Sequence, residues 1–478
     1  MAYRQAERQQ RLLFPESLDD YISSEDPVRA YDAFVDALDM ELLGIECAPH
    51  KVGCPQYDPR IMLKVLIYGY SYGIRSSRKL ERALHHNLSF IWLAGALKPD
   101  HKTLAEFRRR HPKALKEVLK QCARLCIELD LIAGNTLFVD GSKFRGNVSL
   151  NHLWTAERCQ KSLARLDHRI DAILAECENV DAQESDERSL VALKAELVDK
   201  QKLKAKVAGV LEKLHTETLT HFNSTDKDSA RMHGRQGSHA GYNAQIVVDD
   251  RQGLIVHSDV VNANNDLGQF AHQIEQANQT LDEPCKVACA DAGYANGEEL
   301  EKIDAQGIAV IVPSSKQARG QAAGAFDKSR FHYVAEEDVY LCPEGIALPY
   351  RRLNGGRGQR EYYPGRGVCP RCRHFGVCTR NLTTGRKIIR YENEETRRKI
   401  AARYEQACSQ QIYSRRKQKV ELPFGHLKRN LGVDSFLLRG LAGVRAEMSV
   451  MCSCFNMARL IGLLGVSGLI RRFMALGS

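Results

Sequence analysis

The sequence predicts an α/β protein with an all-α amino-terminal region and two insertions in its α/β core. Apolar residues recur at helical spacing in residues 1–130. Two β-prone apolar runs further along each end in a single aspartate, Asp140 and Asp291, and a stretch with helical periodicity separates them. With 478 residues, the chain is long enough for two to four structural modules rather than one simple core.

The positive charge is concentrated near the carboxyl end of an otherwise ordinary globular composition. Hydrophobic residues make up 43% of the chain, charged residues 27%, and the net charge is +10. The last 68 residues, from Gln411, contain 11 Lys and Arg against 3 Asp and Glu, a net charge of +8. This concentration predicts a surface that faces a polyanion, with a generic solvated surface as the alternative.

The sequence predicts a cytoplasmic protein without a membrane span. Met1–Gln10 is polar and charged, so no signal peptide is expected. The apolar stretch Leu460–Leu476 is interrupted by Arg471, Arg472 and several glycines, so it is not expected to cross a membrane. Fifteen cysteines without a secretory signal indicate a reducing compartment.

Residues 1–130 are predicted to form an all-α DNA-binding domain. Helical periodicity is clear in Pro59–Tyr72, and helix starts are expected near Ser76 and at Asp100. Short helices, tight turns and clustered arginines are typical of a helix-turn-helix-like module, but an all-α packing domain with basic faces fits as well. The candidate DNA contacts in this region are two adjacent basic residues, Arg78 and Lys79.

Residues 152–222 are predicted to form a helical hairpin inserted into the core. Apolar residues recur at helical spacing from Leu163 to Leu174 and again from Leu190 to Leu214, with a polar break at Asp181–Arg188 between them. The hairpin carries no obvious chemistry, so a structural role is favoured.

The remaining segments follow the order of a ribonuclease-H-like core. After the run that ends at Asp140 come a β-hairpin, a helix, the run that ends at Asp291, a short helix and another strand. The segments other than the two runs are Gly241–Val260, Leu267–Thr280, Gly297–Gln306 and Ile308–Pro313. Both aspartates are expected at carboxyl-terminal strand tips, and a Gly141-Ser142 turn would leave room for a substrate. Carboxylates held in this way are suitable ligands for a divalent metal ion.

A third acidic residue, Glu421, stands alone in the most basic part of the chain. It is the only acidic residue between Glu405 and Asp434, whereas a solvated surface normally mixes charges of both signs. Lys428 follows seven residues later, about two helical turns, so both side chains can face one substrate if the helix survives Pro423. Pro423 predicts a kink or a fresh helix start just after Glu421.

These features resemble a DDE-class transposase of a bacterial insertion sequence, from the branch with an amino-terminal helical transposase domain. The family's Tyr, Arg, Glu and Lys signature matches Tyr413, Arg416, Glu421 and Lys428, with one more residue between Arg and Glu than in the wider class. The resemblance extends from about Leu13 to Leu460. Its matching stretches are Phe138–Ser142, Gly241–Gln245, Ala290–Tyr294 and Val420–Lys428.

The resemblance implies a metal-dependent enzyme that binds the terminal repeats of its element, cleaves DNA and transfers the strand to a target. Asp140, Asp291 and Glu421 would hold two Mg²⁺ or Mn²⁺ ions per active site, with Asp140 bridging both. The implied partner is double-stranded DNA, bound at the element ends by a homodimer in the bacterial cytoplasm, in association with the nucleoid. The residues expected to contact DNA in this part of the chain are Tyr413, Arg416, Lys428, Arg429, Lys143 and Arg145.

Four cysteines between the second aspartate and Glu421 predict a structural Zn²⁺ site. They are Cys342, Cys369, Cys372 and Cys378, of which the second and third form a C-x-x-C knuckle. The surrounding residues show little periodic apolar core, so this segment is expected to need the metal to fold. The alternative is four free thiols in a loop-rich insertion.

The predicted organisation has four segments: a DNA-binding domain at 1–130, the first part of the core at 131–330, the cysteine-containing insertion at 331–392, and the rest of the core with basic helices at 393–478. Two other functions stay open. One is a catalytically silent, transposase-derived DNA-binding protein, which the presence of all three acidic residues disfavours. The other is a metal-dependent nuclease without strand transfer, which would use the same metal site.

Overall fold

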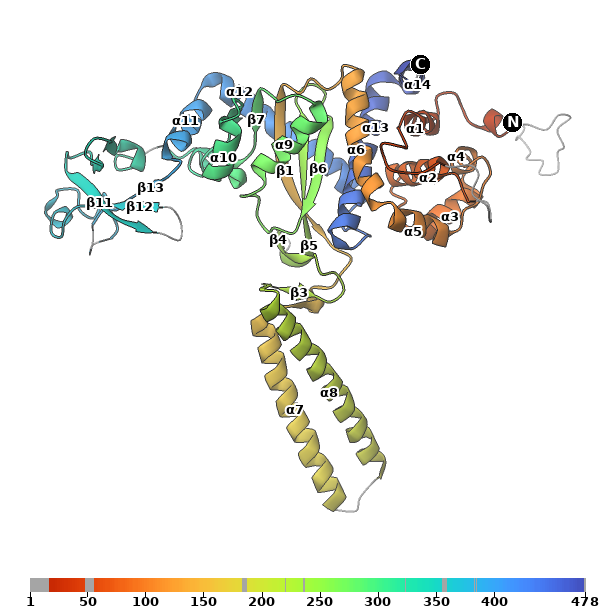
Figure 1. Ribbon diagram of the computed structural model, residues 1–478, viewed down its shortest axis with the longest axis horizontal. Coiled ribbons are helices and arrows are strands. Elements are labelled where there is room, and N and C mark those ends of the chain that lie inside the picture. Colours follow the sequence, from red (N-terminus) through yellow and green to blue (C-terminus); the bar gives the residue numbers. More distant parts are fainter. Residues whose placement is uncertain are drawn as a thin grey trace, which may run out of the picture.

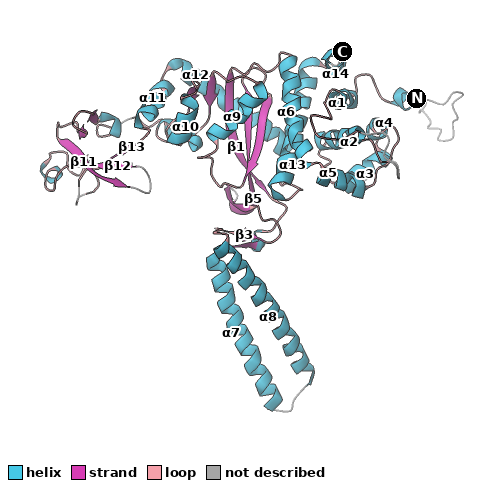
Figure 2. Ribbon diagram, viewed as in Figure 1, coloured by secondary structure: helices cyan, strands magenta, loops and turns pink. Residues whose placement is uncertain are grey.

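The molecule has a central α/β unit from which other parts of the chain extend. Figure 1 shows helices on one side of this unit, a β-rich unit on the other side, and a long helical hairpin that projects from one edge. Figure 2 shows strands in the central unit, in the β-rich unit and at the base of the hairpin. The computed structural model describes residues 17–47, 56–182, 187–219, 221–234, 237–322, 324–354, 359–381, 383 and 385–476.

The central sheet has six strands in the order β4-β5-β1-β7-β8, with β6 also paired to β5. Strand β1 is antiparallel to β5 and parallel to β7, and β7 is parallel to β8. The predicted chain order of strand, hairpin, helix, strand, helix and strand is confirmed as β1, β5–β6, α9, β7, α10 and β8, and it is consistent with a ribonuclease-H-like core. The strands are β1 (Thr136–Arg145), β4 (Ala230–Gly234), β5 (Gly237–Asp249), β6 (Ile255–Val261), β7 (Val287–Cys289) and β8 (Ala309–Ile311).

The central strands form where the sequence has apolar runs because helices cover the sheet. Leu137–Val139 of β1 and Ala240–Asp249 of β5 are buried without alternation. Helix α9 contacts β1, β5 and β6, while α12 contacts β1, β5 and β7. The helices of this part of the chain are α9 (Phe270–Leu281), α10 (Gly297–Asp304), α11 (Glu394–Tyr404), α12 (Ala407–Gly425), α13 (Gly440–Leu464) and α14 (Val466–Leu476).

Helix α13 connects the sheet to the amino-terminal helices. It contacts β6 on one side and α2 and α6 on the other. Among the described residues it is the one helix long and apolar enough to cross a membrane, with a mean hydropathy of 1.2, but 67% of that window is buried in the protein. A core helix that is apolar on all sides has this composition.

The amino-terminal helices share one hydrophobic core with the sheet. Arg75 donates to the fully buried Glu447 of α13 (2.9 Å) and to the Ser435 carbonyl (2.8 Å), so a buried ion pair joins the two parts. Arg108, from the predicted arginine cluster, is buried and donates to the Arg75 carbonyl (2.8 Å). The predicted cap Asp100 does begin a helix. The helices are α1 (Pro27–Asp36), α2 (Pro59–Ser71), α3 (Ser77–His86), α4 (Leu88–Leu93), α5 (His101–Arg110) and α6 (Pro112–Glu128).

The predicted helical hairpin is confirmed as α7 (Ala156–Ala182) and α8 (Glu187–Thr216). The short strands β2 (Leu153–Trp154) and β3 (Phe222–Asn223) pair at its base. A small hydrophobic cluster of its own, which includes Cys159, holds the two helices together near that base.

The β-rich unit in Figure 1 is a five-stranded antiparallel sheet in the order β13-β12-β11-β10-β9. Its buried cluster is Phe331, Tyr340, Leu348, Tyr362 and Ile388. Isolated residues on separate strands form this cluster, which explains why the sequence shows little periodic apolar core here. That the segment needs a metal to fold stays a prediction. The strands are β9 (His332–Val334), β10 (Val339–Leu341), β11 (Ala347–Asn354), β12 (Gln359–Tyr362) and β13 (Ile388–Tyr391).

Helix α12 does not restart at Pro423, so the fresh helix start is wrong, while the alternative of a kink stays a prediction. The helix continues through Pro423 to Gly425 and passes into a π-helical turn at His426–Asn430. Pro423 and Phe424 are buried against the core, and this packing holds the chain helical past the proline.

Candidate active site

The two aspartates lie at one level of the central sheet. The last parallel pair of β1 and β7 is Phe138 with Cys289, and each aspartate follows its member of this pair by two residues. Asp291 comes after the end of β7, as predicted, and accepts a hydrogen bond from the Gly293 N–H (2.7 Å). Asp140 lies within β1 rather than at its tip, because the long strand β5 stays paired with β1 as far as Arg145. The predicted Gly141-Ser142 turn is therefore wrong, since both residues belong to the strand.

Arg416 of α12 lies between the two aspartates. Its guanidinium nitrogens are 3.6 Å from Asp140 Oδ1 and 3.9 Å from Asp291 Oδ2, and the side chain is only 13% exposed. Nη1 has no hydrogen-bond partner among the described residues. Burial raises the pKa of Asp140 to about 6, although the Arg416 charge acts in the opposite direction and the Asp291 charge adds to the rise. The two carboxylates are thus directed at one cationic position.

Glu421 lies elsewhere on the surface of α12. Its side chain is 64% exposed and its carboxylate is 3.8 Å from Lys417 Nζ. Among the contacts of the described residues, none joins Glu421 to Asp140 or Asp291, so its role as third metal ligand stays a prediction. Across the described ranges, no group of three or more His, Cys, Asp or Glu side chains is arranged to hold a metal ion.

An open cavity of about 900 Å³ borders this part of the sheet. Lys428 donates to Ser142 Oγ (2.6 Å) and lies 4.7 Å from the centre of the Phe144 ring. Burial lowers the pKa of Lys428, and the negative charge of Asp140 partly counteracts this effect. The cavity brings together three predicted DNA contacts from distant parts of the sequence. Its lining includes Lys143, Arg145, His239, Lys428 and Asp434.

The other predicted DNA contacts lie outside this cavity lining. Tyr413 packs against the Tyr404 ring, with centroids 5.1 Å apart, and beneath the Arg416 guanidinium at 5.7 Å. It therefore supports Arg416. Arg429 is exposed on the π-helical turn. Two more predicted contacts, Arg78 and Lys79, are exposed on α3 in the amino-terminal region.

Asp266 is an acidic residue near the two aspartates that the sequence analysis does not single out. It accepts hydrogen bonds from Asn243 (2.7 Å) and Gln245 (2.8 Å), both buried on β5. Its charge raises the pKa of Asp140, as a smaller effect after burial. A signal was present, because Asp266 ends a polar run between a predicted strand and a predicted helix.

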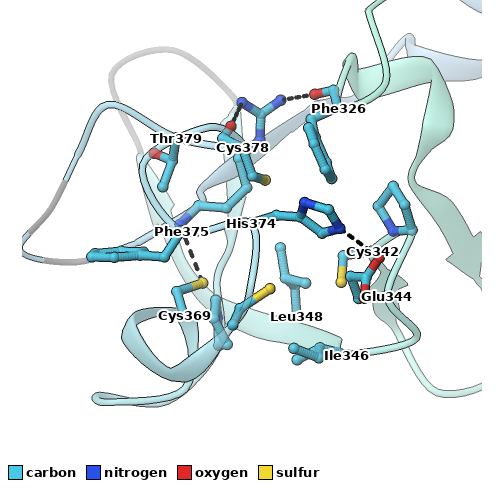
Figure 3. Close-up of a pocket in the computed structure, with 14 residues that line it drawn as sticks. Phe326, Cys342, Glu344, Ile346, Leu348, Cys369, His374, Phe375, Cys378 and Thr379 are labelled. Atoms are coloured by element: carbon cyan, nitrogen blue, oxygen red, sulfur yellow. Dashed lines mark hydrogen bonds and ion pairs between the residues drawn. The ribbon is translucent and has the colours of Figure 1, made fainter.

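The four predicted zinc ligands line one small cavity of about 30 Å³ in the β-rich unit. Figure 3 shows Cys342, Cys369 and Cys378 around it, together with His374 and Glu344. The Arg386 N–H donates to Cys369 Sγ (3.4 Å), and the Cys372 N–H donates to the Cys369 carbonyl (3.0 Å). The fourteen cysteines in the described part of the chain are free thiols. Burial raises the pKa of Cys378, and the nearby Cys369, Cys342 and Cys372 add to this rise.

Comparison with known families supports the class that this fold and these aspartates define. Residues 16–110 match the family described as Transposase domain (DUF772), and residues 198–457 match the family described as Transposase DDE domain. The second match covers more than half of the chain and includes Asp291, Glu421 and Lys428, but it begins after Asp140. Comparison with curated proteins and with solved structures gives no match.

The chain belongs to the DDE-class transposases of insertion sequences. This class comprises enzymes that cleave DNA and transfer its strands. The assignment of Asp140 depends on its geometry, since it is the carboxylate that faces Asp291 across Arg416.

Proposed function

We propose that this transposase binds the terminal repeats of its own element, cleaves DNA there and joins the freed 3′ end to a target, using Asp140 and Asp291. The observation that carries the proposal is the pair of strand-borne carboxylates directed at one cationic position beside a basic cavity. A pair of aspartates with a purely structural role would normally be separated, because like charges in a partly buried place repel each other.

The donor set fits a hard divalent cation. Asp140 and Asp291 offer carboxylate oxygens, which are the ligands that Mg²⁺ and Mn²⁺ prefer. The positive charge of Arg416 lies beside these carboxylates, so their arrangement already suits a cation. Arg416 Nη1 makes no hydrogen bond among the described residues. A bound Mg²⁺ or Mn²⁺ pair would lower the pKa of the attacking water and stabilise the leaving oxygen. Glu421 is proposed as the helix-side ligand.

The basic cavity suits the DNA backbone. Lys143, Arg145 and Lys428 converge there from β1 and the π-helical turn, and Lys and Arg are the usual contacts to phosphate oxygens. Arg416 is placed to grip a phosphate next to the two aspartates. These contacts would position the strand to be cut, while recognition of the terminal repeats is proposed for the amino-terminal helices with Arg78 and Lys79. A homodimer that holds two element ends is part of this proposal.

A strand-transfer assay with the DNA that flanks the gene tests this function. Wild-type protein with Mg²⁺ is expected to cut at the element ends and to join them to target DNA, whereas Asp291→Asn is expected to do neither. The matched control is Asp250→Asn, since Asp250 also binds a basic residue of α12 (Arg415, 2.8 Å) but does not face Asp291. End binding without cleavage by the wild type would favour a silent DNA-binding protein, and cleavage without joining would favour a nuclease.

We also propose that the four cysteines of the β-rich unit bind one structural Zn²⁺. The donor type suits zinc, because four thiols line one cavity and a backbone N–H already points at one of the sulfurs, although no three of these described side chains are arranged to hold a metal ion in this structure. Gly385 has φ +76°, and a Cβ there would lie 2.7 Å from Cys369 Sγ, so a side chain would intrude on this sulfur. A bound Zn²⁺ would hold the loops against the five-stranded sheet.

Elemental analysis of the purified protein tests the zinc proposal. About one zinc per chain is expected, and Cys372→Ser should lower both the zinc content and the protease resistance of residues 331–392. Cys408→Ser is the control, because Cys408 is an exposed thiol on α12. A metal-free preparation with equal protease resistance would leave the four cysteines as ordinary thiols.

A further inference from the structure

The β-rich unit carries a dense positive charge. Residues 350–391 contain 11 Lys and Arg and a single acidic residue, Glu361, a net charge of +10 that equals the net charge of the whole chain. Arg360 and Arg390 even lie directly opposite each other on β12 and β13. Like charges in this position destabilise a sheet, so the excess charge indicates a role other than folding.

Part of this charge does stabilise the unit. Arg386 donates to two backbone carbonyls, at 3.2 and 3.0 Å, and Arg390 lies over the Tyr333 ring at 3.8 Å. Other arginines of the unit are exposed and belong to no ion pair among the described residues. They are Arg351, Arg360, Arg366, Arg371 and Arg380.

Three exposed cations are held together at Glu361 and Tyr363. The Glu361 side chain is buried, and its Oε2 accepts from Arg352 Nε (2.6 Å) and from Lys387 Nζ (3.0 Å). Arg351 Nε donates to the Tyr363 carbonyl (3.2 Å), and the Tyr363 ring lies 5.8 Å from both the Arg351 guanidinium and Lys387 Nζ. One carboxylate is thus shared by three cations, which leaves an excess of two positive charges in fixed positions.

The two arginines of this cluster are fixed in a way that leaves their outer nitrogens open. Arg351 and Arg352 are both held through Nε, and no hydrogen bond among the described residues uses their Nη atoms. A guanidinium with open Nη atoms matches the oxygens of a phosphate group, and its fixed position reduces the entropy lost on binding. The cluster therefore suits a polyanion with phosphate groups.

The position of the unit indicates which DNA it meets. Figure 1 shows the β-rich unit and the amino-terminal helices on opposite sides of the central unit. The contacts proposed for the element ends lie in the amino-terminal helices and in the basic cavity, so the β-rich unit is placed for a second duplex. Contacts to phosphates carry no sequence information, which suits a target of any sequence.

We infer that a basic face of the β-rich unit, made of Arg351, Arg352 and Lys387, binds the phosphate backbone of the target DNA. This inference rests on the proposed function, because a target is needed only if the element ends are joined to it. The buried Glu361 orients two of the three cations and does not itself contact DNA.

Binding of a labelled duplex of unrelated sequence to the full-length protein tests the inference. The protein is first saturated with unlabelled element-end duplex, without added Mg²⁺ or Mn²⁺, so that the amino-terminal helices and the basic cavity are occupied. Arg351→Gln with Arg352→Gln should weaken binding of the labelled duplex about tenfold and make the slope of log affinity against log salt less steep by about two. Lys387 still pairs with Glu361 in this variant.

Two further variants separate the role of the basic face from general effects of charge and folding. Arg351→Lys with Arg352→Lys keeps both charges and should keep the salt slope of the wild type. Arg124→Gln with Arg251→Gln is the matched control and should bind like the wild type, because it removes two exposed arginines that already pair with carboxylates.

Unchanged affinity and salt slope in the double Gln variant of the basic face would overturn the inference. So would a loss confined to the element-end duplex, or competition by polyglutamate as strong as by DNA, which would indicate an acidic protein. Should the variant fail to fold, phenylglyoxal modification of the wild type decides: protection of Arg351 and Arg352 by the unrelated duplex supports the inference, and equal modification with and without DNA overturns it. Strand transfer by the wild type tests the proposed function separately.

Discussion

The two sides of the candidate active site are built differently. On the strand side, Asp140 and Asp291 are 19% and 40% exposed and face a common cationic group. On the helix side, Glu421 is 64% exposed and paired with Lys417. In the protein without DNA, the two strand-side carboxylates thus already lie on either side of Arg416. The helix side contributes Arg416 there and no carboxylate.

The difference comes from how strands and helices direct side chains. The register of β1 against β7 pairs Phe138 with Cys289, and each aspartate follows its member of this pair by two residues. Residues two positions apart on a strand share a face, so the two aspartates lie on the same side of the sheet. Successive residues of a helix point about 100° apart, so the direction of a side chain depends on the rotation of the whole helix. In α12 the residues buried near Glu421 are Val420, Pro423 and Phe424, whereas the Glu421 side chain is exposed.

Removal of a strand-side aspartate should have the largest effect. Asp140→Ala or Asp291→Ala is expected to lower the rate of DNA cleavage by about a thousandfold or more, a loss of about 4 kcal/mol of transition-state stabilisation. Binding of the element ends should stay nearly intact, because phosphate contacts by Lys and Arg carry it. Cleavage with Mg²⁺ and gel-shift affinity measure the two effects. Near wild-type cleavage by either variant would contradict the strand-side assignment.

The helix side is tested by Glu421→Gln, for which a smaller loss is expected. If Glu421 joins the metal once DNA is bound, cleavage should fall by about a hundredfold, since a neutral amide is a poor ligand for a hard cation. Glu395→Gln is the matched control, because Glu395 is also an exposed carboxylate paired with a basic residue, Arg390. Unchanged cleavage with slightly stronger DNA binding would identify Glu421 as an ordinary surface charge, with Glu405 or Asp434 to be examined next.

The sequence predicts the elements of this fold well where local patterns suffice. The unbroken apolar run Leu137–Val139 indicates a strand covered on both faces, and the structure confirms it. The long periodic segments on either side of the polar break at Asp181–Arg188 predict the hairpin, and helix α5 starts after Asp100 as expected. These features depend on neighbours in the sequence.

Features that depend on partners far along the chain could not be predicted in this way. Asp266 accepts hydrogen bonds from Asn243 and Gln245, which β5 places beside it, and Gly141 has no side chain that would crowd it. The burial of Glu447 with Arg75, 372 positions apart, joins the amino-terminal helices to the core and has no local signal.

Lys428→Ala should have a modest effect on DNA binding. It removes one expected phosphate contact and the hydrogen bond to Ser142, but no metal ligand. End affinity is expected to fall several-fold, and the slope of log affinity against log salt should become less steep by about one. Lys417→Ala is the control, because Lys417 is a more exposed lysine of α12 outside the cavity lining. Equal salt slopes for both variants would show that Lys428 does not contact a phosphate.

The smallest expected effect is a pH-dependent change in stability on the strand side. Burial raises the pKa of Asp140 from an ordinary value near 4 to about 6, so the folded protein binds this proton more tightly than the unfolded chain does. The stabilisation from the bound proton is therefore complete below about pH 4 and is lost as the pH rises through 6. In metal-free buffer at pH 7.5, Asp140→Asn removes a buried charge and should raise the Tm by a few degrees. At pH 4.5, where Asp140 of the folded wild type is protonated, this advantage should nearly vanish, and added Mg²⁺ at pH 7.5 should stabilise the wild type alone. Thermal melts at the two pH values decide the matter, and an equal difference in Tm at both would show that Asp140 carries no raised pKa.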